Sequence, residues 1–113
     1  MNTEKRPWGK FTVIEDEKTY KLKRIAVEPG QRLSYQSHKK RDENWTIVNG
    51  TAAVTLNGKK YELKYGESVF IERNVKHRIE NTGNNIVEFI EVQTGEYFGE
   101  DDIIRYEDDY NRS

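Results

Sequence analysis

The stretch that decides the fold is Gln36-Ser37-His38, followed five residues after the histidine by Glu43 and then by Gly50. The residues between Glu43 and Gly50 are mostly β-branched or aromatic, which predicts a strand that begins at Glu43 and ends in a tight turn. Residues two apart in a strand point to the same face, so Gln36 and His38 should project together into one interior. The only other histidine, His77, must then reach that interior from a strand across it.

These four side chains have the chemistry of a metal site. Imidazole nitrogen, carboxylate oxygen and amide oxygen all suit a divalent first-row metal, and the chain has no cysteine to offer a thiolate. A lone histidine is more often an ordinary strand residue, but two histidines with a glutamine and a glutamate, set between glycine turns, favour a metal site. We predict Gln36, His38, Glu43 and His77 as ligands of a divalent ion, with zinc the first choice and manganese, cobalt or nickel as alternatives.

Length and composition set limits on the function. The chain has 113 residues, of which 34% are hydrophobic and 35% charged, and this predicts one small domain, residues 1–113, with a modest core. The net charge of −1 gives no reason to expect nucleic acid or an anionic membrane as a partner. The sequence shows no apolar run that would suit a signal peptide or a membrane span. With no cysteine as well, we expect a cytoplasmic protein.

Strand and turn signals dominate the rest of the chain. Asn57-Gly58 between two alternating segments is a strong hairpin signal. Many short strands separated by turns predict an all-β fold, a closed double-stranded barrel or jelly roll. The strands expected besides the one at Glu43 are residues 11–14, 20–27, 51–56, 59–63, 68–71, 77–80 and 86–93.

The last segment, residues 99–110, is the most helix-like piece of the chain. It is highly acidic but carries Ile103, Ile104 and Tyr106, which disordered acidic tails usually lack. We expect it to pack through these three side chains and to close over the mouth of the barrel.

Several of these motifs carry a family resemblance. The chain resembles the type II mannose-6-phosphate isomerases, usually met as the C-terminal cupin domain of bifunctional mannose-1-phosphate guanylyltransferase/mannose-6-phosphate isomerases. The resemblance runs from Arg6 to Arg112 and implies a cupin barrel (a double-stranded β-helix) that interconverts mannose 6-phosphate and fructose 6-phosphate with a divalent metal. With no glycine-rich phosphate loop and no room for a second domain, guanylyltransferase activity is not expected. The matching motifs are Arg6-Pro7-Trp8-Gly9, Gln36-Ser37-His38, Arg41, Glu43-Asn44-Trp45, Gly50-Thr51-Ala52 and the acidic segment 99–110.

The chain also departs from this family. Lys39 and Lys40 stand where a run of histidines commonly follows the first motif histidine, and Asn44 stands where a histidine often follows the glutamate. If Lys40 held a ligand position, that ligand would be lost. The other type of phosphomannose isomerase resembles a Gln-x-His, Glu, His set, which this chain reproduces. Asn74 replaces a turn glycine before the last motif histidine, and asparagine tolerates the left-handed conformation.

An aldose–ketose isomerase needs a base and a group that stabilises the developing enediolate. The sequence leaves the base open among Glu100, Asp101, Asp102 and Lys23. For each of them the alternative is a solvated surface charge.

Arg105 is our first choice to hold the phosphate or the enediolate, because a guanidinium offers planar paired donors and stays charged. Arg24 and Arg41 are second choices, with Lys23 as a further substrate-binding candidate. The alternative for Arg105 is a structural ion pair with Asp101 or Asp109.

Two other classes of function stay open at this level. One is a non-catalytic sugar-phosphate-binding cupin, and the other is a metal cupin of different chemistry. Trp8 is expected to pin an N-terminal arm that covers an edge strand, and this predicts a homodimer. The predicted small-molecule partner is a sugar phosphate.

Overall fold

The computed structural model describes residues 2–110, which form eleven β-strands and contain no helix. The strands are β1 (Asn2–Arg6), β2 (Gly9–Asp16), β3 (Tyr20–Val27), β4 (Tyr35–Ser37), β5 (Arg41–Asn49), β6 (Thr51–Leu56), β7 (Lys59–Lys64), β8 (Ser68–Ile71), β9 (His77–Glu80), β10 (Val87–Gly95) and β11 (Ile104–Glu107). No helix of the described part is therefore long and apolar enough to cross a membrane.

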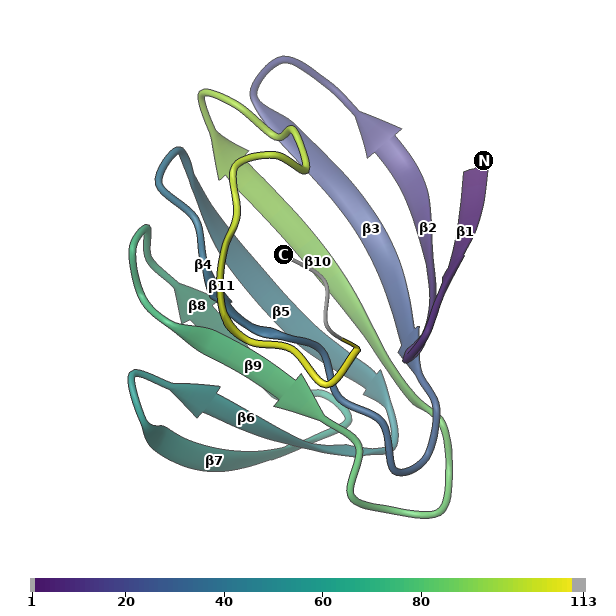
Figure 1. Cartoon of the computed structure of the whole chain (residues 1–113). Coiled ribbons are helices and arrows are strands. Elements are labelled where there is room, and N and C mark those ends of the chain that lie inside the picture. Colours follow the sequence, from purple (N-terminus) through teal and green to yellow (C-terminus); the bar gives the residue numbers. More distant parts are fainter. Residues whose placement is uncertain (1, 111–113) are drawn as a thin grey trace.

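The strands form two antiparallel sheets that face each other (Figure 1). The six-stranded sheet has the order β1-β2-β3-β10-β5-β8, and the five-stranded sheet has the order β11-β4-β9-β6-β7. Chain neighbours are often separated in the sheets, as where β10 inserts between β3 and β5. This arrangement is the all-β jelly roll that the turn spacing predicts.

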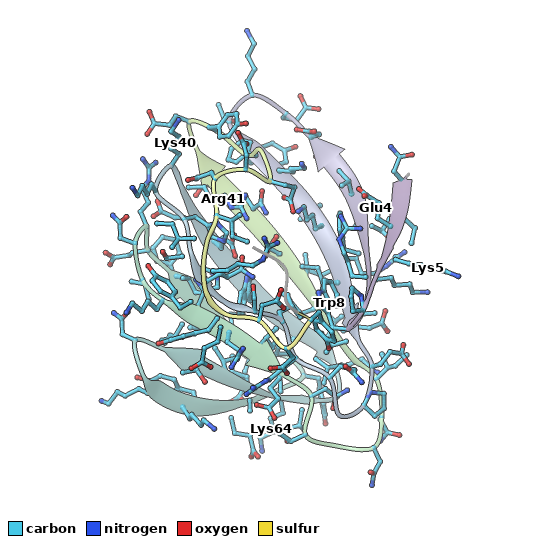
Figure 2. All side chains as sticks on the ribbon, in the orientation of Figure 1. Glu4, Lys5, Trp8, Lys40, Arg41 and Lys64 are labelled. Carbon is cyan, nitrogen blue, oxygen red and sulfur yellow. The ribbon has the colours of Figure 1, made fainter. Side chains whose placement is uncertain are left out.

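One hydrophobic core fills the space between the sheets, because apolar residues alternate with polar ones along the strands that face each other. Trp8, expected to pin the N-terminal arm, is buried in this core (Figure 2). The buried apolar side chains of the core are Trp8, Phe11, Ile25, Val27, Trp45, Ile47, Ala52, Val54, Ile71, Ile79, Val87 and Phe89.

The turn chemistry read from the sequence is confirmed. Asn57 and Gly58 have φ angles of 45° and 83°, as the tight hairpin turn between β6 and β7 requires. Asn74 also adopts the left-handed conformation, with φ of 69°. The strand expected to begin at Glu43 begins two residues earlier, so that Arg41 belongs to β5.

One strand was missed and one prediction was wrong. Strand β1 was missed because its residues are polar and exposed. The extended stretch expected at Gln36 and His38 is β4, which contains Gln36 and ends one residue before His38. The helix-like segment 99–110 contains strand β11 instead, which pairs with β4. β1 pairs with β2 at the edge of its sheet, and the homodimer expected through this arm stays a prediction.

Residues 99–110, which we call the C-terminal strap, cross the open end of the barrel (Figure 1). Ile103 lines the interior cavity, so the strap covers the mouth as expected. Ile104 and Tyr106 are 38% and 43% exposed, however, and do not pack inward. Tyr106 holds the strap differently, through a 2.8 Å hydrogen bond between its hydroxyl and Ser37 Oγ and through its ring against Tyr35.

Candidate metal centre

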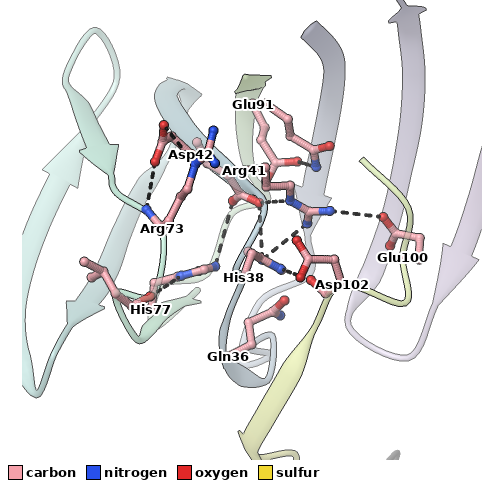
Figure 3. Close-up of polar contacts among 12 residues, drawn as sticks. Gln36, His38, Arg41, Asp42, Arg73, His77, Glu91, Glu100 and Asp102 are labelled. Atoms are coloured by element: carbon pink, nitrogen blue, oxygen red, sulfur yellow. Dashed lines mark hydrogen bonds and ion pairs between the residues drawn. The ribbon is translucent and has the colours of Figure 1, made fainter. Parts of the chain in front are cut away.

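Three buried side chains from different elements meet between the sheets. His38 directly follows β4, Glu43 lies in β5 and His77 begins β9. One nitrogen or oxygen of each lies within 4.8 Å of the others, and all three residues are 2% or 3% exposed. His38 Nε2 is 3.3 Å from Glu43 Oε2, and His77 Nε2 is 3.8 Å from Glu43 Oε1 (Figure 3).

Backbone carbonyl groups fix the orientation of both imidazoles. The Asp102 carbonyl accepts a 2.6 Å hydrogen bond from His38 Nδ1, and the Val75 carbonyl accepts a 3.0 Å bond from His77 Nδ1. With the proton on Nδ1, each Nε2 carries a lone pair that faces the Glu43 carboxylate. Three groups that present lone pairs and no proton thus surround one position, and this arrangement suits a bound cation.

The protonation states agree with this assignment. Burial lowers the pKa of His38 to about 4, with the Arg41 and His77 charges adding to the effect against the opposing Glu43 charge. Burial also lowers the pKa of His77. Burial alone would raise the pKa of Glu43, but the charges of His77, Arg41 and His38 outweigh it and lower that pKa. The three groups are therefore in their metal-binding forms near neutral pH, and this donor set fits a divalent ion.

Gln36, the fourth predicted ligand, lies beside this group and lines the same cavity (Figure 3). Its backbone pairs with that of His77 across β4 and β9. Its amide nitrogen donates a 2.9 Å hydrogen bond to Ser34 Oγ, which leaves the amide oxygen as the atom that could bind an ion.

The cavity around the group has a volume of about 80 Å³, and most of the charged side chains in its wall are cationic. The wall holds five cationic side chains and three carboxylates, so its charge favours an anionic ligand. The cationic residues are Arg6, Lys23, Arg41, Arg78 and Arg105, and the acidic ones are Glu43, Glu91 and Glu100.

Lys23, Glu100 and Arg105 are therefore brought together with the metal group, as predicted. Lys23 Nζ lies 3.1 Å from Glu100 Oε2. Partial burial opposes ionisation of Glu100, but the Lys23 ammonium outweighs it and lowers the pKa of that carboxyl. Glu100 is thus an ionised carboxylate at the mouth of the cavity.

Three of the predicted candidates lie elsewhere. Arg24 is exposed on the outer face of β3, because alternation turns Lys23 and Ile25 inward. Asp101 is exposed and accepts a hydrogen bond from the Tyr97 hydroxyl. The Asp102 carboxylate accepts hydrogen bonds from the Lys39 and Lys40 amides, at 3.1 Å and 2.9 Å, and so anchors the strap.

Both acids named as ion-pair partners of Arg105 have other contacts. Asp109 pairs with Arg32, at 2.7 Å, and Asp101 accepts a hydrogen bond from the Tyr97 hydroxyl. Arg105 lines the cavity from β11, where its backbone pairs with that of Gln36.

Sequence reasoning missed Glu91, which is buried beside Glu43. Trp45 Nε1 donates to both carboxyl groups, with the nitrogen 3.0 Å from Glu43 Oε1 and 3.1 Å from Glu91 Oε1. Burial first, and then the charge of Glu43, raise the pKa of Glu91 to about 8. The available signal was its place two residues after Phe89 in an alternating strand, which put it on the inward face.

The three positions at which family histidines are replaced lie outside the centre. Lys39 and Lys40 are exposed, and Lys40 lies over the ring of Tyr97 at the rim, whereas the next residue, Arg41, points inward (Figure 2). Asn44 lies on β5 between the inward residues Glu43 and Trp45 and so faces away from the centre. No predicted ligand is lost through these replacements.

The fold and the site define a cupin barrel that contains a His38–Glu43–His77 group able to hold a metal ion. Among solved structures, a cupin domain from Schizosaccharomyces pombe matches with a TM-score of 0.78 and 18% identity, over 84% of this chain and 69% of that one. A cupin-superfamily sugar phosphate isomerase from Silicibacter pomeroyi matches with a TM-score of 0.70 and 15% identity, over 75% of this chain and 58% of that one. At these identities the likeness concerns the fold alone.

The chain belongs to the family of mannose-6-phosphate isomerase C-terminal domains, whose sequence profile matches residues 1–108. It is 48% identical over 108 residues to a mannose-1-phosphate guanylyltransferase of Salmonella montevideo, covering 96% of this chain and 23% of that protein. It is 45% identical over 108 residues to the xanthan biosynthesis protein XanB of Xanthomonas campestris pv. campestris, covering 96% of this chain and 23% of that protein. The chain thus spans about a quarter of the length of these relatives.

Proposed function

We propose that this protein is a metal-dependent isomerase that interconverts mannose 6-phosphate and fructose 6-phosphate. The observation that carries the proposal is an acceptor group suited to a metal in the wall of a cavity whose charged side chains are mostly cationic. Family membership supports the substrate class.

The size of the cavity suggests how the substrate lies. About 80 Å³ holds an ion and the reacting carbons of a sugar. The phosphate end would then extend to the mouth beneath the strap, where Arg105 supplies a permanent paired donor.

His38, Glu43 and His77, with the Gln36 amide oxygen, would hold the metal. A divalent ion bound there supplies Lewis-acid polarisation of the substrate carbonyl. Glu100 is the proposed base, because it is ionised and faces the cavity beside Lys23. It would remove the proton from the carbon next to the carbonyl and return it to the former carbonyl carbon. The hydroxyl proton would pass to the former carbonyl oxygen, so that the hydroxyl oxygen becomes the new carbonyl, while the strap excludes water.

A coupled isomerase assay on purified protein tests the proposal. Chelation should abolish turnover and addition of a divalent ion should restore it. Arg105→Ala should reduce turnover about 100- to 1000-fold, the loss expected for one donor aimed at anionic charge in the transition state. Arg24→Ala, which removes the same charge from the outer face, should leave turnover unchanged.

One outcome favours the second candidate function. If the fully metallated protein binds mannose 6-phosphate but shows no turnover in either direction, it is a sugar-phosphate-binding cupin, and the isomerase assignment falls.

A further inference from the structure

Arg41 has an unusual position for a guanidinium, because it is buried against the proposed metal ligands. Its side chain is 6% exposed. Arg41 Nε donates a 2.9 Å hydrogen bond to Glu43 Oε2, and Nη2 lies 3.3 Å from His38 Nε2 (Figure 3). One guanidinium thus contacts two of the three groups that would bind a metal.

The contact with His38 excludes simultaneous metal binding by the same atom. His38 Nδ1 donates to the Asp102 carbonyl, so Nε2 has the only free lone pair of the ring. That lone pair can accept a hydrogen bond from Arg41 or bind a metal ion, but it cannot do both. The described arrangement and a metal-bound one are therefore alternatives, and Nη2 must leave His38 when a metal binds.

The third nitrogen of the guanidinium shows where the released group would point. Arg41 Nη1 is buried and has no hydrogen-bond partner among the described residues, and Glu100 Oε2 lies 4.0 Å from it. A buried donor without a partner is costly, and such a group needs an explanation. Arg41 lines the cavity, so an oxygen atom of a ligand in that cavity would satisfy Nη1.

We propose that Arg41 is an exchangeable cation of this site: it occupies the acceptors of Glu43 and His38, and a metal ion displaces it to become a two-donor fork for an oxyanion of the substrate. Nη1 and the released Nη2 lie on one planar group and can bind two oxygens, or one oxygen twice. The oxyanion role rests on the proposed isomerase function, whereas the competition with metal does not.

Metal affinity gives the first test. Removing Arg41 should raise the affinity if Arg41 competes with the metal, and should lower it if Arg41 has a purely structural role. Arg41→Met removes the competing cation, so Zn²⁺ affinity, measured by competition with a chromophoric chelator, should rise at least tenfold. If Arg41 only positions Glu43, the same change should weaken Zn²⁺ binding, and that result would overturn the proposal. Arg41→Lys keeps the charge and should stay within about threefold of the wild type, and Arg24→Met is the matched control on the outer face.

Anion affinity gives the second test, with glycolate as a two-carbon probe that carries a carboxylate beside a hydroxyl. In the Zn²⁺-loaded proteins, Arg41→Met and Arg41→Lys should both bind glycolate at least tenfold more weakly than the wild type, because both lack the fork. Equal glycolate affinity in the wild type and the two variants would contradict the oxyanion role of Arg41. Isomerase turnover is measured separately, so a protein that passes the metal test without turnover would refute the proposed function and leave the exchange intact.

A third measurement needs no substitution and covers the case in which a variant fails to fold. In ¹⁵N spectra of the wild-type protein, Zn²⁺ should shift His38 Nε2 and change the Arg41 guanidinium resonances together. An Arg41–His38 hydrogen bond that persists at saturating Zn²⁺ would contradict the exchange.

Discussion

At the residue scale, the centre depends on how each imidazole is held. Carbonyl oxygens at Nδ1 keep the protons of His38 and His77 away from Glu43, so both Nε2 atoms face the same point. Such outer partners fix the tautomer of a metal-binding histidine. In the described part of the chain, Arg41 contacts the imidazole nitrogen of His38 but not that of His77, which makes His77 the cleaner position for testing the centre.

His77→Ala should abolish stoichiometric metal binding and isomerase turnover, because it removes one of two nitrogen ligands. Elemental analysis after reconstitution and gel filtration checks the first effect. Lys40→His is the matched comparison: it restores a family histidine at an exposed position, and it should leave metal content and affinity unchanged. A gain of bound metal in Lys40→His would show that the rim takes part in binding.

Single residues also show what sequence can and cannot predict about the site. Gln36, His38, Glu43 and His77 were predictable because ligand chemistry coincides with strand alternation and glycine turns. Glu91 and the burial of Arg41 were not predicted, because burial of a charged residue depends on partners from other strands, as with Trp45 and Glu91. Arg24 was misplaced for a simpler reason, since adjacent strand residues such as Lys23 and Arg24 face opposite sides.

At the scale of elements, the strap joins the mouth of the cavity to the metal centre. Asp102 makes this connection twice, through its carbonyl to His38 and through its carboxylate to the Lys39 and Lys40 amides. The isoleucines of the strap predicted that it covers the cavity. The sequence did not predict strand β11, because β11 pairs with the short strand β4.

The anchoring by Asp102 should depend on pH. Slight burial opposes ionisation, but the hydrogen bonds from the Lys39 and Lys40 amides outweigh it and lower the pKa of Asp102 below its ordinary value of 3.8. A lowered folded pKa means that the stabilisation is fully present above the unfolded pKa and is lost as the pH falls through the folded value. Hydrogen-exchange protection of the two amides should therefore be constant above about pH 5 and fall below it.

Two variants isolate this effect from protonation elsewhere. Asp102→Asn should remove most of the pH dependence, and Asp101→Asn, next to it but outside the contact, should retain it. Protection that stays constant down to acid pH in the wild type would show that the carboxylate does not anchor the strap.

Gly95, at the end of β10, allows the backbone at the start of β5 to approach closely. It lies opposite Arg41 and has a φ of 146°, and a Cβ atom there would lie 2.4 Å from the Lys40 carbonyl oxygen. Gly95→Ala should lower the free energy of unfolding by about 2–4 kcal/mol through backbone strain and this clash. Gly83→Ala, whose Cβ would meet its nearest atom at an ordinary 3.7 Å, should change it by less than about 1 kcal/mol. Urea unfolding curves of the two variants check the difference, and similar midpoints would refute the argument.

At the scale of the whole molecule, the metal centre lies between the two sheets. His38 and His77 belong to segments of the five-stranded sheet, and Glu43 belongs to the six-stranded sheet. The same two sheets share one hydrophobic core. The jelly roll was predictable from turn spacing and the family resemblance, but the sheet order was not, because pairings such as β10 with β5 join segments far apart in sequence.

A metal ion at this position should stabilise both sheets together. Binding at 100 times the dissociation constant adds about 2.7 kcal/mol to the free energy of unfolding, which corresponds to a rise in Tm of about 10–20 °C for a domain of this size. Far-UV circular dichroism reports the strands of both sheets. Tryptophan fluorescence reports the surroundings of the centre, because Trp8 and Trp45 both line its cavity and the Trp45 ring lies 5.4 Å from that of His77. The two signals should move together with Zn²⁺ in the wild type and should not move in His77→Ala. If only the fluorescence transition shifted, the ion would be ordering its local surroundings without joining the sheets.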